Sequence, residues 1–261
     1  MIEITSRDNP LLKSIRRLAQ DANAYRKQGQ IWLEGDHLCR AALSRGVRPQ
    51  QVVLTSGVWK SDPLAWRDVC DQVYVVSEDL FATLSGLESP AQMGFLLDYT
   101  SAPVLQPAAP TVVLDRVQDA GNVGSILRSA SAFGFKQVLA LKGTAALWSA
   151  KVLRAGMGAH FGMHLLEGAT LEQVSMLTVP LVTTSSHLGP FLHDMLFDKK
   201  LPATCAWVFG HEGQGVCNDV MAMAGYQVRI AQPGGEESLN VASAAAICLQ
   251  ASSMAKLTQR L

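Results

Sequence analysis

The sequence predicts an α/β protein, and three observations support that prediction. Short apolar runs of strand length alternate with stretches whose apolar residues recur at helical spacing. Hydrophobic residues make up 48% of the 261 residues and charged residues 17%, which is ordinary for a protein with a sizeable core. Two late strands end in loops rich in glycine or proline, and the second loop opens a long helix of small residues. Such loops at the carboxyl ends of strands are typical of a small-molecule site.

Residues 1–100 predict a small α/β sandwich. A helix over 9–28 has an apolar face formed by Leu11, Leu12, Ile15, Leu18 and Ala19. Basic residues surround that face, namely Lys13, Arg16, Arg17, Arg26 and Lys27. This basic surface is either a solvated helix face or a surface that contacts phosphates. Strands are then expected at 30–33, 51–54, 73–76 and 94–97, and helices at 36–44, 63–70 and 78–84.

The stretch TSAPVLQPAAP, residues 100–110, has the composition of an extended linker, because it holds three prolines and no charged residue. We therefore expect one domain over 1–100, a linker at 101–110 and a second domain over 111–261. In the second domain we expect strands at 111–114, 137–140, 163–166, 181–184, 206–209 and 227–230. Helices are expected from a turn at 115–121 to about 133 and from 241 to about 257, and residues 187–201 are expected to form a mobile loop that faces the site.

The net charge is zero, which argues weakly against a nucleic-acid partner. Residues 1–50, however, hold nine Lys and Arg against five Asp and Glu, a local basic excess. The five cysteines have no metal-like spacing, which favours reduced thiols in a cytoplasmic protein. The N-terminus does not have the pattern of a signal peptide, and no apolar run approaches the length that spans a bilayer.

A strand, a glycine-containing turn and a helix at 111–133 raise the possibility of a dinucleotide-binding domain. The glycines are spaced as Gly121 and Gly124, not as G-x-G-x-x-G. No Asp or Glu occurs between Asp119 and Glu167, so the acid expected to bind the ribose is absent. We reject that interpretation.

Three segments of the C-terminal part occur in an order and spacing that identify a family. They are LDRVQDAGNVGSILRSASAFG at 114–134, GHEGQGV at 210–216 and RIAQPGGEESLNVASAAAI at 229–247. They resemble the three motifs of the SpoU (TrmH-like) family of S-adenosylmethionine-dependent RNA 2′-O-ribose methyltransferases. Upstream, WLEGDH at 32–37 and GFLLDY at 94–99 are similar to the L30e-like substrate-binding domain that precedes the catalytic domain in several members. Met157 and Gly158 depart from the small-residue segment that the family usually carries there.

The resemblance implies a SPOUT fold, an α/β knot whose parallel sheet carries a deep C-terminal trefoil knot. Knots are rare, so no pattern in the residues predicts one. The resemblance also implies a homodimer with cofactor sites near the dimer interface, where the small residues of 242–251 permit close packing. It implies RNA as the substrate and S-adenosyl-L-methionine as the cofactor. From the residues themselves we expect a cytoplasmic protein that uses no metal and no membrane. We expect ribosomal (23S) RNA rather than tRNA.

The resemblance assigns catalytic positions to Arg128, Asn122, Glu212, Ser238 and Asn240. It assigns cofactor binding, through backbone groups, to Gly210, Ile230 and Leu239. Arg128 acts as a base in some proposals for the family. A guanidinium keeps its proton at neutral pH, however, so Arg128 suits a phosphate clamp that stabilises a developing alkoxide.

Each of these residues has a plainer interpretation that the sequence leaves open. Arg128 could be a salt-bridged helix residue, and Asn122 could cap its helix with or without orienting Arg128 or the ribose. Ser238 and Asn240 could be helix caps, and Glu212 is expected to anchor Asn122 or Arg128 by charge-assisted hydrogen bonds. His211 is more typical of an incidental loop residue.

Two other functions remain possible at this stage. The chain could be an inactive RNA-binding module, although the intact motif residues argue against that. It could also methylate a base or a small molecule with the same cofactor, which detection of ribose rather than base methylation would distinguish.

Overall fold

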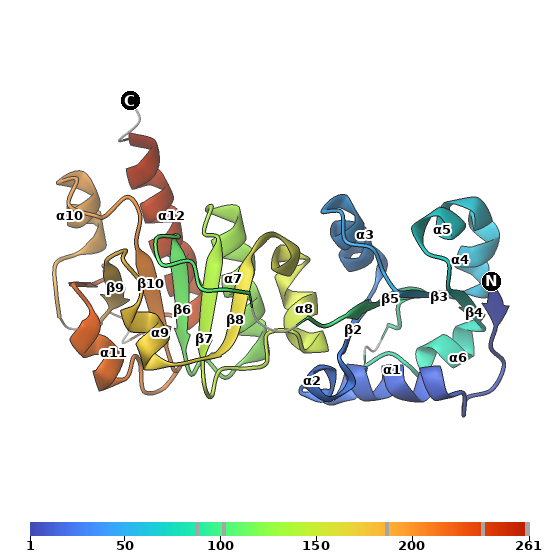
Figure 1. Cartoon of the computed structure of the whole chain (residues 1–261). Helices are drawn as coiled ribbons and strands as arrows, with labels where there is room; N and C mark the ends of the chain where they lie inside the picture. The colour runs from blue at the N-terminus through green and yellow to red at the C-terminus, as the bar shows by residue number, and fades with distance from the viewer. Residues whose placement is uncertain (87–88, 101–102, 186–187, 236–237, 259–261) are drawn as a thin grey trace. The chain divides into compact units, whose positions relative to one another are not determined.

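The structure is a computed structural model that describes residues 1–86, 89–100, 103–185, 188–235 and 238–258 (Figure 1). The strands are β1 (Ile2–Glu3), β2 (Gln30–Glu34), β3 (Gln51–Thr55), β4 (Val73–Val76), β5 (Met93–Asp98), β6 (Thr111–Asp115), β7 (Gln137–Leu141), β8 (His164–Ala169), β9 (Leu181–Thr184), β10 (Ala206–Gly210) and β11 (Tyr226–Val228). The helices are α1 (Pro10–Gln20), α2 (Ala24–Gln28), α3 (Asp36–Ser44), α4 (Ser56–Ser61), α5 (Pro63–Val69), α6 (Glu78–Ala82), α7 (Ala120–Ala132), α8 (Ala150–Gly156), the 3-10 helix η1 (Ala159–Gly162), α9 (Leu171–Ser175), α10 (Leu192–Phe197), α11 (Asn218–Met223) and α12 (Val241–Thr258).

The chain divides into two compact units. Unit 1 comprises Met1–Ser101 and Trp148–Phe161, and unit 2 comprises Ala102–Leu147 and Gly162–Leu261. This division differs from the expected one, because Trp148–Phe161 was expected in the C-terminal domain. Residues 101 and 102 of the expected linker lie outside the described residues.

Unit 1 is built on a five-stranded mixed sheet in the order β1-β4-β3-β5-β2. Helices α3, α4 and α5 lie on one side of this sheet, and α1, α2 and α6 lie on the other (Figure 1). The core contains Trp32, Phe81 and Phe95, each almost completely buried. Gly94 is required beside Trp32, because a Cβ at residue 94 would lie 2.1 Å from the indole ring. The alternating strands and helices of the expected small sandwich are therefore present.

The segment from the second half of the sequence packs against β2 inside unit 1. Val152, Leu153 and His160 are buried there, which removes apolar surface from water. Arg154 on α8 forms an ion pair with the buried Glu34, with 3.7 Å between Nη1 and Oε2. Glu34 also accepts a hydrogen bond from the Ser85 hydroxyl. Glu34 therefore has a structural role that joins residues far apart in the sequence.

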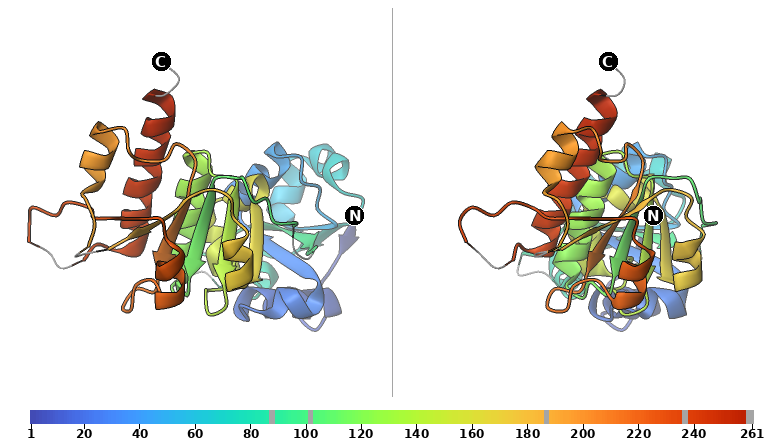
Figure 2. Two further views of the ribbon diagram at one scale, coloured as in Figure 1. Left: turned by 60° about the vertical axis from the view of Figure 1, so that its left-hand side comes forward. Right: turned by 90° about the vertical axis from the view of Figure 1, so that its left-hand side faces the viewer.

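Unit 2 is built on a six-stranded sheet in the order β11-β9-β10-β6-β7-β8, in which all neighbours are parallel. Figure 2 shows α7, α10 and α12 on one face and α9 and α11 on the other. Trp207 on β10 faces α12, because its indole Nε1 donates to the Ser252 hydroxyl at 2.8 Å. Val208 faces the opposite side and packs with Val174 of α9 and Val220 of α11. Since neighbouring parallel strands end at one edge, the loops after β6, β9 and β10 meet there.

The structure corrects several expected elements. The helix expected over 9–28 is broken into α1 and α2, because Asp21 adopts an extended backbone with φ −99° and ψ 114°. Helices α4, α9 and α11 were not expected. The loop expected at 187–201 contains α10, and its residue 187 lies outside the described residues.

In the described ranges, no helix combines the length and the hydropathy needed to cross a membrane.

All five cysteines are free thiols. Burial raises the pKa of the Cys205 thiol to about 11 and also raises the pKa values of Cys39 and Cys248, so these three thiols stay protonated.

Candidate active site

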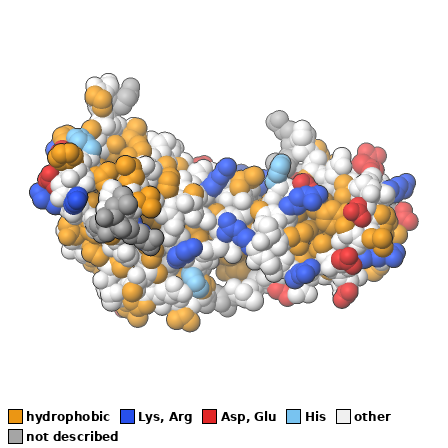
Figure 3. Space-filling model, turned by 90° about the horizontal axis from the view of Figure 1, so that it is seen from above, with side chains coloured by type: hydrophobic (Ala, Val, Ile, Leu, Met, Phe, Trp, Pro, Cys, Tyr) orange, Lys and Arg blue, Asp and Glu red, His pale blue; other side chains and the backbone are white. Residues whose placement is uncertain are grey.

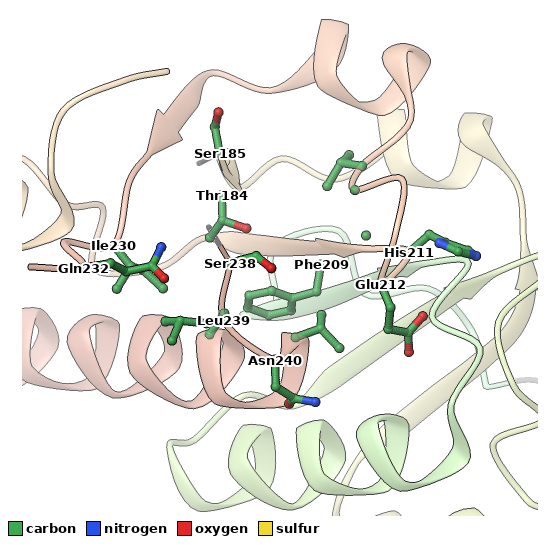
Figure 4. A pocket seen from close by; sticks show the side chains of 15 residues that line it. Thr184, Ser185, Phe209, His211, Glu212, Ile230, Gln232, Ser238, Leu239 and Asn240 are labelled. Atoms are coloured by element: carbon green, nitrogen blue, oxygen red, sulfur yellow. The ribbon is translucent and has the colours of Figure 1, made fainter. Parts of the chain in front are cut away.

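A pocket of about 350 Å³ opens at the carboxyl edge of the unit 2 sheet (Figure 4). Its walls come from the ends of β9 and β10, the turn after β10, the loop after β11 and the first turn of α12. Three residues expected to bind a cofactor, Gly210, Ile230 and Leu239, line this pocket. The volume falls in the range of small-molecule sites. The structure therefore brings these three positions, from separate segments, to one cavity.

Gly210 is required by the turn that follows it. A Cβ at residue 210 would lie 2.1 Å from the carbonyl carbon of Gly215, which is closer than any side chain tolerates. The turn folds back onto the end of β10 because residue 210 has no side chain. The glycine thus shapes the pocket wall through the protein's own backbone.

The end of β6 supports the same turn from the side. The buried Asp115 accepts a hydrogen bond from the Cys217 N–H at 2.6 Å and one from Arg116 Nε at 2.9 Å. Arg116 has φ +61°, an uncommon conformation for a residue with a side chain, and its Nη1 donates to Gln214 Oε1 at 3.0 Å. Burial alone raises the pKa of the Asp115 carboxyl, but hydrogen bonds from Arg116 and Cys217 outweigh it and hold the pKa below the ordinary value of 3.8. This charged support was not predicted from the sequence.

Three of the expected catalytic residues form one chain of hydrogen bonds. Asn240 Nδ2 donates to Asn122 Oδ1 at 2.9 Å, and Asn122 Nδ2 donates to Glu212 Oε1 at 3.1 Å. Figure 4 shows the Glu212 carboxylate and the Asn240 amide extending toward the same helix, α7. These bonds fix the orientation of the Asn122 amide, because its oxygen must face Asn240 and its nitrogen must face Glu212.

The Glu212 carboxylate is held in its ionised form. It accepts the backbone N–H of Gln118 at 3.2 Å and of Asp119 at 3.1 Å as well as the Asn122 amide. Partial burial raises the pKa of Glu212, but these hydrogen bonds and one from its own N–H outweigh it and lower the pKa below 4.5. The expected link between Glu212 and Asn122 is present, whereas Arg128 is not bonded to Glu212.

The helix caps differ from one of the sequence interpretations. Asn122 does not cap α7, because the cap is Asp119, whose Oδ1 accepts the Asn122 N–H at 2.7 Å. This leaves the Asn122 side chain free for Glu212 and Asn240. Asn240 does act as a cap, since its Oδ1 accepts the N–H groups of Ala242 and Ser243. Its amide nitrogen still reaches Asn122, so capping and site formation occur together.

Arg128 stands apart from this cluster. It is exposed on α7, it does not line the pocket, and it makes no hydrogen bond or ion pair with any other described residue. Arg128 is therefore not the salt-bridged helix residue that the sequence left open. Ser238 lines the pocket, and within the described ranges its hydroxyl has no hydrogen-bond partner.

Thr184, Ser185 and Gln232 also line the pocket and were not singled out from the sequence. Thr184 is the last residue of β9, so the rule that ligands bind at the carboxyl ends of strands could have found it. For Gln232, the sequence indicated only that it belongs to a loop that contains a proline. Its Oε1 is buried without a hydrogen-bond partner in the described structure, which leaves an acceptor on the pocket wall.

The pocket carries little charge. Of the described side chains that line it, Glu212 alone is ionised when histidine is neutral. Nowhere in the described chain do three or more His, Cys, Asp or Glu side chains come close enough together to hold a metal ion. A neutral to weakly acidic pocket suits a neutral or cationic ligand better than a phosphate.

Comparison with known proteins adds to this geometry. Residues 109–250 match the SpoU rRNA Methylase family, and residues 9–94 match the MRM3-like substrate binding domain. A tRNA/rRNA methyltransferase of Synechocystis is 32% identical over 257 residues, covering 94% of this chain and 91% of the relative. The 23S rRNA (guanosine(2553)-2′-O)-methyltransferase RlmP of Bacillus subtilis is 29% identical, covering 95% and 97%. An AdoMet-bound rRNA methyltransferase from Sinorhizobium meliloti superposes with a TM-score of 0.80 at 25% identity, covering 96% of both chains.

Proposed function

Because the chain belongs to the SpoU rRNA methylase family, we propose that it transfers a methyl group from S-adenosylmethionine to a ribose 2′-hydroxyl of 23S ribosomal RNA. The observation that carries the proposal is the hydrogen-bonded chain of Asn240, Asn122 and Glu212 beside the pocket. It joins residues of three separate motifs at one edge of the sheet. The Bacillus subtilis relative is named as a 23S rRNA 2′-O-methyltransferase, which favours that RNA over tRNA.

The pocket fits S-adenosylmethionine on chemical grounds. Its lining holds no lysine or arginine among the described residues, so nothing there repels a sulfonium cation, and the nearby Glu212 carboxylate favours one. The Gln232 side-chain oxygen has no hydrogen-bond partner among the described residues, so it would accept a hydrogen bond from an amino group. Backbone groups at Gly210, Ile230 and Leu239 would hold the molecule. When bound, it supplies an activated methyl group.

The side chains around the pocket then position the ribose. Methyl transfer to a hydroxyl requires the oxygen to lie in line with the bond that breaks, so orientation is the main demand on the protein. The Asn122 amide is held from both sides, and Asn240 and Glu212 fix it. The Ser238 hydroxyl lies on the pocket wall without a partner in the described part of the chain, and it would hydrogen-bond the ribose.

Arg128 is proposed to contact the RNA rather than the cofactor. Its guanidinium is exposed and unpaired among the described residues, and it carries a charge that phosphates bind in a bidentate way. A positive charge close to the target nucleotide also stabilises an oxygen that loses its proton. A role for Arg128 in RNA contact is consistent with its position away from the pocket.

Unit 1 is assigned to substrate binding. The match of residues 9–94 to a substrate-binding domain and the basic surface of α1 support this role. We retain 1–100 as the RNA-binding domain, 101–110 as the linker and 111–261 as the methyltransferase domain by sequence, with Trp148–Phe161 packing into unit 1.

We also propose that the protein is a homodimer. A stripe of exposed apolar residues on α12, formed by Ile247, Met254 and Leu257, supports a homodimer. Figure 3 shows hydrophobic side chains gathered over the part of unit 2 where α10 and α12 lie. Sedimentation velocity distinguishes the dimer from a monomer.

The trefoil knot is supported by the path of the chain near β11. The Arg229 N–H donates to the Pro190 carbonyl and the Leu192 N–H donates to the Arg229 carbonyl, so residue 229 lies against the loop that follows β9. We further propose that the protein acts in the cytoplasm and needs no metal. An experimental structure tests the path of the chain.

The RNA is identified by mapping ribose methylation in total RNA from cells with and without the gene. The expected result is one 2′-O-methyl group in 23S rRNA that disappears with the gene and returns with the wild-type chain. Loss of a tRNA methyl group would instead assign the enzyme to tRNA. An unchanged map would contradict both assignments.

A further inference from the structure

The turn after β10 is held from within by the ring of His211. The His211 N–H donates to the Gly215 carbonyl oxygen at 3.1 Å, and the Gly215 N–H donates back at 2.8 Å, so the turn closes on itself. Inside this closure His211 Nδ1 accepts the N–H of Gly213 at 3.0 Å and of Gln214 at 3.3 Å. Two of the three residues between the closing pair therefore depend on one side-chain nitrogen.

These bonds determine the protonation of the ring. A nitrogen that accepts hydrogen bonds carries no proton, so Nδ1 is unprotonated and the neutral ring has its proton on Nε2. Figure 4 shows the His211 ring turned away from Leu239 and Thr184 on the other walls of the pocket. His211 is one of the residues that line the pocket, and its Nδ1 is engaged by the turn.

The turn carries Glu212, the anchor of the catalytic cluster. Glu212 lies directly after His211, and its carboxylate receives the Asn122 amide and the N–H groups of Gln118 and Asp119. If the Gly213 and Gln214 N–H groups lose their acceptor, the backbone on the far side of Glu212 is released. The position of Glu212, and through it the Asn122 amide, then becomes less defined.

We propose, on the premise of the function given above, that His211 is a positioning residue that acts through Glu212 and only while its ring is neutral. Protonation places a hydrogen on Nδ1, which then can donate but cannot accept. Histidine is the side chain whose charge changes between about pH 5 and 8. Methyl transfer therefore declines on acidification as the turn loses its internal acceptor.

Four charged groups belong to the turn and to the elements packed against it. They are Glu212 on the turn itself, Asp115 and Arg116 at the end of β6, and Asp119 before α7. No titratable side chain of α12 or of the loop after β11 lines the pocket in the described ranges. Arg116 also donates to Gln214 Oε1 at 3.0 Å. That support does not titrate near neutrality, so the turn loosens without unfolding.

Asparagine at position 211 provides the matched test. An asparagine Oδ1 accepts backbone N–H groups two and three residues ahead in an Asx-type turn, and it does not titrate. We compare the wild type with His211→Asn, His211→Ala and the control His164→Ala, an exposed histidine at the start of β8. Single-turnover methyl transfer is measured from about pH 5.5 to about pH 8.5.

At the alkaline end, His211→Asn should match the wild type within about threefold, and His211→Ala should be about 10- to 30-fold slower at every pH. On acidification the wild-type and His164→Ala rates should fall by about tenfold more than the His211→Asn rate. A wild-type rate and profile in His211→Ala would overturn the proposal. So would an alkaline rate of His211→Asn as low as that of His211→Ala, or an acid decline in His211→Asn equal to that of the wild type.

Nuclear magnetic resonance separates this inference from the proposed function. If no variant methylates RNA, the proposed function fails, but the ring can still be observed. An unprotonated Nδ1 at about pH 8, with the Gly213 and Gln214 amide signals shifting as the ring titrates, supports the positioning role. A protonated Nδ1 at that pH overturns it.

Discussion

Asn122, Glu212 and Asn240 show how individual side chains link distant segments into one site. Asn122 and Glu212 are 90 positions apart and are joined by a hydrogen bond of 3.1 Å. Asn122 and Asn240 are 118 positions apart and are joined by one of 2.9 Å. The amide of Asn122 has no freedom to flip, because each of its ends already has a partner. In this site the Asn122 side chain is held in one orientation, whereas the Ser238 hydroxyl and the Arg128 guanidinium are without partners among the described residues.

Arg128 is the first residue to test. Arg128→Ala should slow methyl transfer by about 10²–10³, since removal of a transition-state contact costs ~3–4 kcal/mol. Affinity for S-adenosylmethionine should stay nearly unchanged, because Arg128 does not line the pocket. Arg128→Lys should remain impaired, since it loses the bidentate fork. Single-turnover rates and separate cofactor titrations measure the two effects.

Lys136→Ala is the matched control for Arg128, because Lys136 is an exposed cation of the same unit that precedes β7, at the other edge of the sheet. It should behave as the wild type. Normal turnover in Arg128→Ala, with the fold intact, would remove Arg128 from the mechanism.

Glu212 gives a prediction about pH. Its folded-state pKa is lowered below 4.5, so the stability that its carboxylate contributes is complete above that value and is lost as the pH falls through the folded-state pKa. Glu212→Gln places an amide against the N–H groups of Gln118 and Asp119 and should lower the Tm at neutral pH. The Tm difference from wild type should shrink toward about pH 3.5. Thermal unfolding across this range measures it.

Glu172→Gln, which changes an exposed carboxylate on α9, serves as the control for Glu212→Gln. It should give no comparable Tm difference. A Glu212→Gln difference that is unchanged down to about pH 3.5 would mean that the charge of Glu212 does not contribute to stability.

At the scale of elements, the loops at the carboxyl edge depend on close backbone approach. Gly210→Ala should weaken S-adenosylmethionine binding by tenfold or more, because the new Cβ would lie 2.1 Å from Gly215 and displace the turn. The rest of the sheet should stay folded, since β10 pairs with β6 along its whole length and with β9 over residues 206–208. Isothermal calorimetry with circular dichroism separates binding from folding.

Gly225→Ala is the control for this change. A Cβ at residue 225 meets nothing within 4 Å and the residue has no positive φ, so the variant should bind as the wild type does. Equal affinities of the Gly210 and Gly225 variants would show that the turn tolerates displacement.

Much of the architecture followed from local patterns. The apolar runs at β4 and β9 and the periodic helix α3 have the expected bounds, because both signals are local. The motif residues 122, 212 and 240 converge because strands of a parallel sheet end at one edge. Helices α4, α9 and α11 are five or six residues long, too short to show a helical period.

Other features depend on contacts that no local pattern contains. The ion pair of Arg154 with Glu34 joins residues 120 positions apart, so the sequence did not indicate that α8 packs into unit 1. Because asparagine is a common cap, the sequence left open that Asn122 caps α7, but Asp119 lies three residues earlier and takes that role. The free Asn122 side chain is the consequence for function.

At the scale of the whole molecule, we propose that unit 1 binds the RNA and unit 2 binds the methyl donor. Lys13→Glu with Arg17→Glu on α1 should weaken RNA binding. The slope of the logarithm of the binding constant against the logarithm of the salt concentration should fall in magnitude by about one for each phosphate contact that is lost. Cofactor affinity should not change, because both residues belong to unit 1 and the pocket belongs to unit 2. Filter binding at several salt concentrations measures the slope.

Arg45→Glu with Lys60→Glu makes the same change in net charge on the α3 and α4 side of the unit 1 sheet (Figure 1). If that control weakens RNA binding as much as the α1 variant does, the effect comes from net charge and α1 is not the contact surface.

The proposed activity is methylation of a ribose hydroxyl of RNA. To measure it, the purified protein is incubated with methyl-labelled S-adenosylmethionine, a metal chelator and an unmodified 23S rRNA transcript, and the RNA is then digested to nucleosides. We expect label in a single 2′-O-methyl nucleoside, with the chelator present, and none with Arg128→Ala over the same time. Label in a methylated base, or no label in RNA from a protein that binds the cofactor, would contradict it.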